Sequence, residues 1–315
     1  MTPKRRRNRN RGIAIVVLTA LVVLAFVYLF FFLGRGGSEA VGSSLTDGAV
    51  ASGETAASAD GPAASSLASA DSGKSGAASD AGDDAADPEP AYPSYYDPAL
   101  AARYDAFAQA RPDLTEDEVW WMVGCDLDKA PYTDTQAVPD PNSELLLVNK
   151  HYYLPDDYVP ADLVTIGATQ LRQEAAEHLQ AMIDAAAAEG LNLWAQSGYR
   201  GYGVQVSLYN QYSAADGAEA ADTYSARPGY SEHQTGLTCD MNTITDAFGD
   251  TAEGRWVAAH AHEYGYIVRY TPENSDVTLY KYEPWHLRYI GTEAAARMHD
   301  EGIASFEEYW VKYVK

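Results

Sequence analysis

The pattern of apolar and polar residues divides the chain into three parts. Residues 13–33 form an uncharged, apolar run of 21 residues, which is long enough to cross the hydrocarbon core of a bilayer, about 30 Å thick. The 12 residues before it contain six basic residues and no acidic one. Because positive charge stays on the cytoplasmic side, the pattern predicts a cytoplasmic tail at 1–12 and an anchor at 13–33.

A cleaved signal peptide is the competing interpretation of the same run. The apolar region of a signal peptide is about 7–15 residues long and is followed by a small-residue cleavage site. Here the run is longer, and it ends in three phenylalanines and a leucine before Gly34 and Arg35. We therefore expect a single-pass protein of the cell membrane, with all that follows the anchor outside the cell.

Residues 34–92 are mainly Ala, Ser, Gly and Asp, with very few large apolar side chains. Such a segment cannot bury enough apolar surface to offset the entropy lost on ordering. It is predicted to be a disordered linker. The remaining residues, 93–315, are enough for one extracellular domain with a full core.

Within this domain, apolar residues at helical spacing predict the clearest helix at 168–189, ended by Gly190. A second helix is expected at 97–110. Thr115 followed by Glu118 is typical of a capping box, which starts a third helix. Further helices are expected at 202–214 and 252–264, and strands at 145–148, 191–195, 235–241 and 278–290.

Helices and strands are mixed here without a regular strand–helix alternation. This order favours an α+β fold, with an antiparallel sheet flanked by helices. No internal repeat is visible in the sequence.

The charge balance excludes one class of partner. The chain has 22 basic and 45 acidic residues, a formal net charge of −23, although the basic tail holds six of the basic ones. Phosphate contacts require clustered Lys and Arg side chains, so nucleic acid binding is not expected.

The two cysteines, Cys125 and Cys239, allow two interpretations. A disulfide is compatible with an extracellular domain. A buried free thiol fits equally well, since Cys239 lies in an apolar, strand-like run. Neither cysteine has another one near it in sequence, which argues against a cysteine zinc site.

Candidate chemistry is concentrated in two short blocks. His233 and Asp240 are seven residues apart, and His286 follows in the second block. If Gly236 makes a turn before a strand, His233 and Asp240 can reach one metal, and His286 completes a His, His, Asp set. Three protein ligands and one open position are typical of catalytic zinc.

Glu283 is the candidate base beside this metal. In a regular strand, Glu283 and His286 point to opposite faces. Pro284 has no N–H to donate, so a bend or bulge at Pro284 and Trp285 can bring both side chains to one pocket. The hypothesis requires that irregularity. Glu232 alternates with His233 and is expected to be solvated.

These blocks resemble the VanY-type D-alanyl-D-alanine carboxypeptidases, zinc peptidases with the hedgehog/DD-peptidase fold. The similarity covers about 145–291, with the family's motifs in order. The matching pieces are Leu147-Val148-Asn149-Lys150, Tyr158-Val159-Pro160-Ala161-Asp162-Leu163, Ser197-Gly198-Tyr199-Arg200, Gln205, Pro228-Gly229-Tyr230-Ser231-Glu232-His233-Gln234-Thr235-Gly236-Leu237, Asp240 and Glu283-Pro284-Trp285-His286-Leu287-Arg288-Tyr289.

The resemblance implies a role for each site residue. One zinc ion is bound by His233, Asp240 and His286, and Glu283 is the catalytic base. Arg200 belongs to the substrate pocket, where it serves the substrate's C-terminal carboxylate, the oxyanion or both. Gln205 and Ser231 are expected nearby, and the implied substrate is a peptidoglycan stem peptide ending in D-Ala.

Small departures from the family pattern remove no ligand. Gly201 stands where a serine is common, and Thr238 with Cys239 replaces the usual small or aliphatic pair. The sequence is compatible with three alternatives. These are an L,D-carboxypeptidase acting on tetrapeptide stems, a dipeptidase acting on free D-Ala-D-Ala, and a non-catalytic, zinc-containing module that binds the cell wall. Retention of Glu283 argues against the module.

Overall fold

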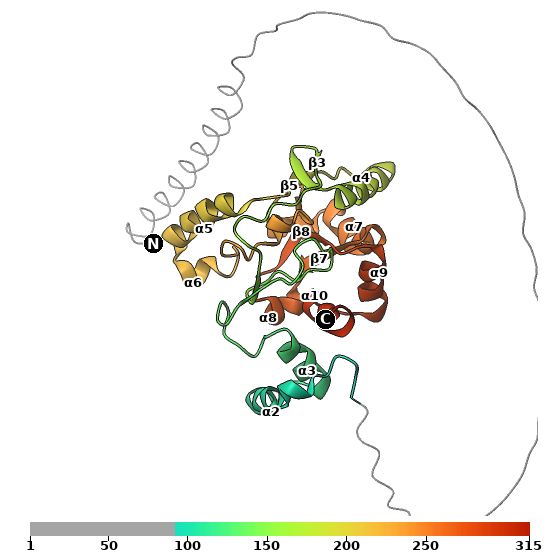
Figure 1. Cartoon of the computed structure of the whole chain (residues 1–315). Helices are drawn as coiled ribbons and strands as arrows, with labels where there is room; N and C mark the ends of the chain where they lie inside the picture. Colours follow the sequence, from blue (N-terminus) through green and yellow to red (C-terminus); the bar gives the residue numbers. More distant parts are fainter. Residues whose placement is uncertain (1–91) are drawn as a thin grey trace, which may run out of the picture. The chain divides into compact units, whose positions relative to one another are not determined.

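The structure is a computed structural model that describes residues 92–315 (Figure 1). The cytoplasmic tail, the anchor and nearly all of the linker expected from the sequence lie outside the described residues. In the part of the chain that is described, no helix is both long and apolar enough to cross a membrane.

A four-stranded sheet lies at the centre, in the order β5-β6-β8-β7. Its strands are β5 (Ala195–Ser197), β6 (Thr238–Met241), β8 (Glu283–Tyr289) and β7 (Tyr266–Tyr270), and every neighbouring pair is antiparallel. All seven residues of β8 are buried, as expected for a strand that is paired on both edges and covered on both faces. The α+β class with an antiparallel sheet is therefore confirmed.

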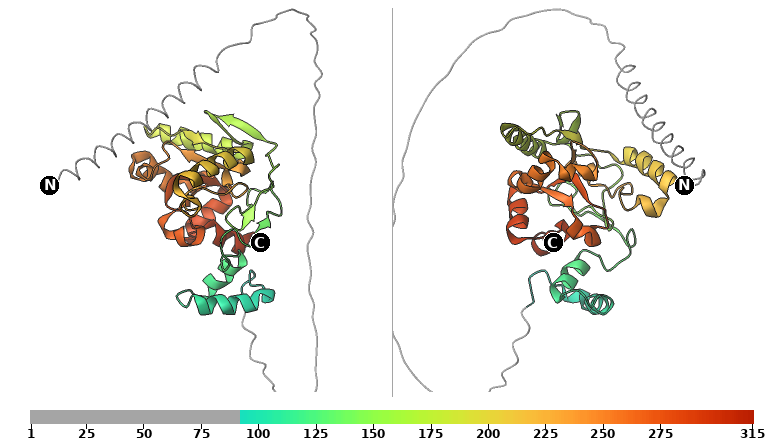
Figure 2. Two further views of the ribbon diagram at one scale, coloured as in Figure 1. Left: turned by 90° about the vertical axis from the view of Figure 1, so that its left-hand side faces the viewer. Right: turned by 180° about the vertical axis from the view of Figure 1, so that it is seen from behind.

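Helices surround this sheet. The pair α5 (Tyr202–Asp216) and α6 (Ala218–Ala221) lies on one side of the domain, and α9 (Thr292–Glu301) lies on the opposite side (Figures 1 and 2). The remaining elements are η1 (Pro98–Leu100), α2 (Ala101–Ala110), α3 (Glu116–Gly124), β1 (Gln136–Ala137), β2 (Tyr152–Tyr153), β3 (Leu163–Ile166), β4 (Thr169–Arg172), α4 (Gln173–Ala188), η2 (Glu232–Thr235), η3 (Asp246–Asp250), α7 (Ala252–His260), η4 (Ala261–Tyr264), η5 (Pro272–Asn274), α8 (Ser275–Thr278) and α10 (Phe306–Tyr313).

The helix expected at 168–189 is present, but it begins later. Its buried face consists of residues spaced three or four apart, including Leu179, Met182 and Ala186 on α4. The first residues of the expected helix instead form β4, which pairs with β3 across a turn at Gly167. Gly167 has a φ of 58°, a conformation that glycine adopts at little cost.

The strand expected at 145–148 is wrong. Leu146, Leu147 and Val148 are buried in the core, but they do not pair with a strand. The carbonyl of Leu146 instead accepts a hydrogen bond of 2.9 Å from Nη2 of Arg288. The apolar run at 145–148 therefore predicted burial correctly, but it did not form the strand that we expected.

The capping box at the start of α3 is confirmed. The hydroxyl of Thr115 accepts from the backbone N–H of Glu118, and the Glu118 carboxylate accepts from the backbone N–H of Thr115 at 2.7 Å. In the same first turn of α3, Asp117 pairs with Lys312 at 2.8 Å, which joins this N-terminal helix to α10.

Both cysteines are free thiols with fully buried side chains. The disulfide that the sequence left open is therefore not formed. Burial raises the pKa of both thiols well above its usual value, so neither is a reactive thiolate.

Candidate metal centre and substrate pocket

Three elements bring the predicted metal ligands together. His233 lies on the 3₁₀-helix η2, Asp240 on β6 and His286 on β8. Asp240 and His286 are directly paired across the antiparallel strands. Gly236, with a φ of 70°, ends η2 and makes the turn into β6. This turn lets the side chain of His233 lie close to that of Asp240.

Within residues 92–315, this is the one group of three or more His, Cys, Asp or Glu side chains close enough to hold a metal ion. Its donor atoms all lie within 4.8 Å of one another. Asp240 Oδ2 is 3.5 Å from His233 Nε2, and Asp240 Oδ1 is 3.4 Å from His286 Nδ1. All three side chains are buried, so solvent competes little for the donors.

Hydrogen bonds on the outer side of each ring favour the tautomers that a metal needs. His233 Nδ1 is 2.7 Å from the carbonyl oxygen of Gly198, which can only accept, so the proton sits on Nδ1 and Nε2 faces the site. His286 Nε2 is 3.3 Å from Oε2 of Glu232, so Nδ1 of this ring faces the site. Two imidazole nitrogens and one carboxylate oxygen form a donor set that fits catalytic zinc.

The electrostatics of two ligands, His233 and Asp240, agree with this assignment. Burial, together with the positive charge of Arg200, lowers the pKa of His233 and favours the neutral ring. Burial alone would raise the pKa of Asp240, but the neighbouring histidines hold it well below its usual range. Asp240 is therefore an ionised carboxylate, as a metal ligand must be. Burial lowers the pKa of the third ligand, His286, but hydrogen bonds to Asp240 and Glu232 outweigh it and raise this pKa to about 9, so metal binding must displace one proton from the ring.

Glu283 meets His286 because β8 contains the irregularity that the hypothesis required. Val268 pairs with Leu287 and Tyr270 pairs with Glu283, so two steps along β7 correspond to four along β8. Pro284 lies within this bulge. As a result, Glu283 Oε2 is 3.6 Å from His286 Nδ1. Burial raises the pKa of Glu283 to about 7, close to the value that suits a general base at neutral pH.

A pocket of about 580 Å³ opens over these side chains. All seven site residues that the sequence singled out contribute to its lining: Arg200, Gln205, Ser231, His233, Asp240, Glu283 and His286. Tyrosines from several segments complete the walls, among them Tyr212 on α5 and Tyr280 before β8.

The guanidinium of Arg200 has unused hydrogen-bonding capacity in this pocket. Its Nε is buried without a hydrogen-bond partner, and among the described residues Arg200 forms no ion pair. The backbone N–H of Arg200 donates to the carbonyl of His233 at 3.1 Å, which ties its position to the metal centre. A partly buried cation without an ion-pair partner is costly, so this arrangement is suited to a ligand that carries negative charge.

Gln205 and Ser231 are also buried beside the pocket, with different capacities. The side-chain N–H of Gln205 donates to the carbonyl of Ala226 at 2.7 Å, whereas its buried Oε1 has no partner. The free atom of Gln205 is therefore an acceptor. Ser231, at the start of η2, keeps its hydroxyl as a donor or an acceptor.

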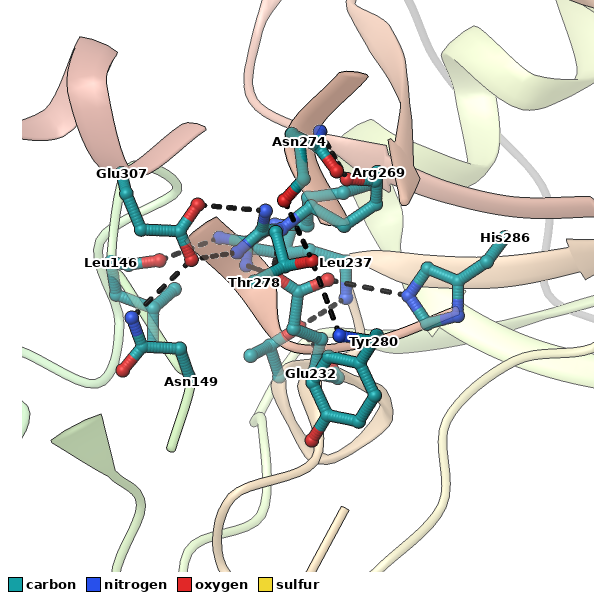
Figure 3. A network of polar contacts seen from close by, with 12 residues as sticks. Leu146, Asn149, Glu232, Leu237, Arg269, Asn274, Thr278, Tyr280, His286 and Glu307 are labelled. Carbon is teal, nitrogen blue, oxygen red and sulfur yellow. Dashed lines mark hydrogen bonds and ion pairs between the residues drawn. The ribbon is translucent and has the colours of Figure 1, made fainter. Parts of the chain in front are cut away.

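The expectation that Glu232 is solvated is wrong, since the residue is only 2% exposed. That expectation assumed strand-like alternation with His233, but the segment is a 3₁₀-helix, in which neighbouring side chains diverge by about 120°. Figure 3 shows Glu232 between His286 and two charged side chains that the sequence did not single out, Arg269 and Glu307. Arg288 also donates to Glu232.

Comparisons with known proteins agree with the site. The family model for VanY, described as D-alanyl-D-alanine carboxypeptidase, matches residues 168–292. A putative carboxypeptidase of Bacillus subtilis, YodJ, is 41% identical over 196 residues, which are 57% of this chain and 71% of the relative. A D-alanyl-D-alanine carboxypeptidase of Enterococcus faecalis is 33% identical over 52% of this chain, and the chain covers 65% of it, slightly less than two thirds.

Among solved structures, the LdcB LD-carboxypeptidase, described in connection with peptidoglycan recognition, is similar in fold. Its TM-score is 0.54 at 41% sequence identity, and the match covers 57% of this chain and 91% of that one.

Proposed function

Because the chain belongs to the VanY family of D-alanyl-D-alanine carboxypeptidases, we propose that it removes the C-terminal D-alanine from peptidoglycan stem peptides as a zinc D,D-carboxypeptidase. One observation carries the proposal. His233, Asp240 and His286 converge beside Glu283 in a pocket that also holds the unpaired guanidinium of Arg200.

The cofactor is a single zinc ion, held by Nε2 of His233, a carboxylate oxygen of Asp240 and Nδ1 of His286. When bound, zinc supplies Lewis acidity, which acidifies the attacking water and polarises the scissile carbonyl. All three ligand residues line the pocket, so a substrate there would be within reach of a metal held by them.

Glu283 acts as the general base and then as the general acid. Its carboxylate lies 3.6 Å from a ligand nitrogen, and its pKa of about 7 allows it to accept a proton and to return it. It takes the proton of the attacking water and passes it to the leaving amine of D-alanine. Both transfers occur within one pocket, so no second acid is required.

Arg200 recognises the negative charge of the substrate. A carboxypeptidase must bind a free C-terminal carboxylate, and a guanidinium can donate two parallel hydrogen bonds to it. The free Oε1 of Gln205 can accept from a peptide N–H, and Ser231 can donate to a carbonyl. Together they give the substrate's last peptide unit a fixed orientation relative to Glu283.

A second candidate is an L,D-carboxypeptidase acting on tetrapeptide stems. The similarity to the LdcB LD-carboxypeptidase favours it. Both substrates end in a D-alanine carboxylate, which Arg200 can bind in either case. They differ in the configuration of the residue before the scissile bond, so the preference depends on the pocket walls and not on the metal centre.

A non-catalytic, zinc-containing module is disfavoured by the same geometry. Structural zinc sites are closed by four protein ligands, whereas this site has three and opens into a pocket. A structural site also has no use for a buried base such as Glu283.

The domain is proposed to work on the outer side of the cell membrane, anchored by residues 13–33. The apolar run and the basic residues before it support this location. Protease added to intact protoplasts should degrade the domain. A domain that stays protected until the membrane is disrupted would exclude this orientation.

The purified full-length protein, in detergent and supplied with zinc, should be incubated separately with muramyl pentapeptide and muramyl tetrapeptide. Mass spectrometry should show the loss of one alanine from the pentapeptide. Loss from the tetrapeptide alone would establish the L,D activity instead, and loss from neither, with zinc bound, would exclude both carboxypeptidases.

A further inference from the structure

Four charged side chains lie almost completely out of solvent behind the metal centre. Glu232, Arg269, Arg288 and Glu307 each have side chains no more than 1% exposed, and their formal charges sum to zero. Figure 3 labels Glu232, Arg269 and Glu307. They come from η2, β7, β8 and α10, so the cluster joins segments far apart in the sequence.

One oxygen of Glu232 is held firmly by two arginines. Oε1 accepts from Nε of Arg269 at 2.8 Å and from Nη1 of Arg288 at 3.3 Å. Arg288 is itself fixed, because its other nitrogens donate to backbone carbonyls, including that of Leu146. The carboxylate of Glu232 therefore has little freedom to rotate.

Arg269 is in turn held by the C-terminal helix. Its two terminal nitrogens donate to the two oxygens of Glu307 at 2.9 and 2.7 Å, a bidentate pair. The amide of Asn149 also donates to Glu307, at 3.3 Å. Glu307 thus holds the guanidinium of Arg269 in place, and Arg269 in turn holds the carboxylate of Glu232.

The second oxygen of Glu232 points at the metal centre. Oε2 lies 3.3 Å from Nε2 of His286. The carboxylate of Glu232 thus lies between two arginines on one side and the His286 ring on the other. A carboxylate paired with two arginines can only accept, so Nε2 of His286 donates to Glu232 and Nδ1 is the ring nitrogen on the side of Asp240.

We propose that Glu232 is a positioning residue for the metal ligand His286, and that Glu307 on α10 supports it through Arg269. The inference rests on the metal centre of the proposed function. It extends that centre to α10, which lies beyond residues 168–292 matched by the family model. The C-terminal helix is then part of the support of the metal site.

A purely stabilising role explains the network less well. Burying two ion pairs carries a large desolvation cost, and apolar residues of similar volume often stabilise a core equally well or better. Here one carboxylate oxygen is left for a ligand histidine. Carboxylates that hydrogen-bond to metal-binding histidines fix the tautomer and the orientation of the ring.

The Glu232→Gln substitution tests the proposal by changing what faces His286. The amide oxygen will turn to the two arginines, which leaves the amide N–H₂ facing Nε2. That arrangement favours the tautomer with its proton on Nδ1, which cannot bind metal. Zinc affinity, measured by competition with a chelator, should fall by about 10- to 100-fold. The visible spectrum of the cobalt-substituted protein should change as well.

Asp126→Asn is the matched control. Asp126 is also buried and ion-paired, to Arg103 at 2.8 Å and Lys129 at 3.0 Å, and it contacts no residue of the metal centre. This variant should lower the melting temperature and leave zinc affinity and the cobalt spectrum unchanged.

Wild-type zinc affinity and an unchanged cobalt spectrum in Glu232→Gln would overturn the proposal. If Glu232→Gln does not fold, the zinc affinity of Glu307→Gln tests the proposal instead. Zinc affinity at least about threefold below that of Asp126→Asn supports the proposal, and equal affinity refutes it. Peptide turnover is not among these readouts. A protein that binds zinc as described but releases no D-alanine would refute the proposed function and leave this inference standing.

Discussion

Glu283 and His286 are three residues apart in one strand, yet Glu283 Oε2 lies 3.6 Å from His286 Nδ1. A regular strand would place the two side chains on opposite faces. The bulge at Pro284, where four residues of β8 pass two of β7, turns both into one pocket. The proposed base and a proposed metal ligand are therefore neighbours because of a local defect in strand pairing.

Glu283→Gln should separate metal binding from proton transfer. The amide keeps the size of the side chain but cannot accept the proton of water, so turnover should fall by about 10²- to 10⁴-fold. Zinc content, measured by atomic emission, should match that of the wild-type protein. Full activity in this variant would refute the role of Glu283 as base.

Asp240→Ala should remove the metal and, with it, the activity. Asp240 supplies the one carboxylate oxygen of the donor set, and two neutral imidazoles alone bind zinc weakly. Zinc content after dialysis and D-alanine release should both be lost. His260→Ala is the control, because His260 is on the surface of α7, outside the pocket, and pairs with Glu263. Zinc retention by Asp240→Ala would contradict the ligand assignment.

Arg200→Lys should weaken substrate recognition without affecting zinc. Lysine keeps the charge but loses the fork that can bind a carboxylate through two hydrogen bonds. The loss of one hydrogen bond to a charged group corresponds to about a 10- to 100-fold fall in kcat/KM. Steady-state kinetics on the pentapeptide measures this fall, and unchanged kcat/KM would show that Arg200 does not contact the substrate.

The sequence predicted those features of the site and the fold that depend on residues close together in the chain. His233, Asp240, Glu283 and His286 were identified because their types and spacing within two short blocks indicate zinc chemistry. The helix α4 was identified because its buried face repeats every three or four residues. In both cases the signal is local.

The sequence did not indicate the charged network around Glu232, because the residues that form it are far apart in the chain. Arg269 is 37 residues from Glu232 and 38 from Glu307, and nothing near either residue in sequence indicates the pairing. The irregular path at 145–148 was missed for a similar reason. Apolar side chains signalled burial there, but the hydrogen-bond partner of Leu146 is Arg288, 142 residues away.

Lys150 should make stability depend on pH. Its ammonium donates to the carbonyls of Asp222 and Leu279 at 2.8 and 2.7 Å, and burial lowers its pKa to about 8. Between pH 8 and about 10, the unfolded chain binds this proton and the folded protein does not, so the free energy of unfolding should rise with pH.

Compared with Lys150→Met, the wild-type protein should gain about 1–2 kcal/mol of stability across this range. Urea denaturation of both proteins at several pH values measures the gain. A difference in unfolding free energy that stays constant with pH would show that Lys150 remains charged in the folded protein.

Zinc titration of the metal-free, full-length protein, with release of D-alanine from muramyl pentapeptide as the readout, tests the central claim most directly. The arrangement of His233, Asp240, His286 and Glu283 predicts no release without metal and a rise that saturates at one zinc ion per chain. Release that continues in the metal-free protein, or saturation with zinc that produces no D-alanine, would contradict it.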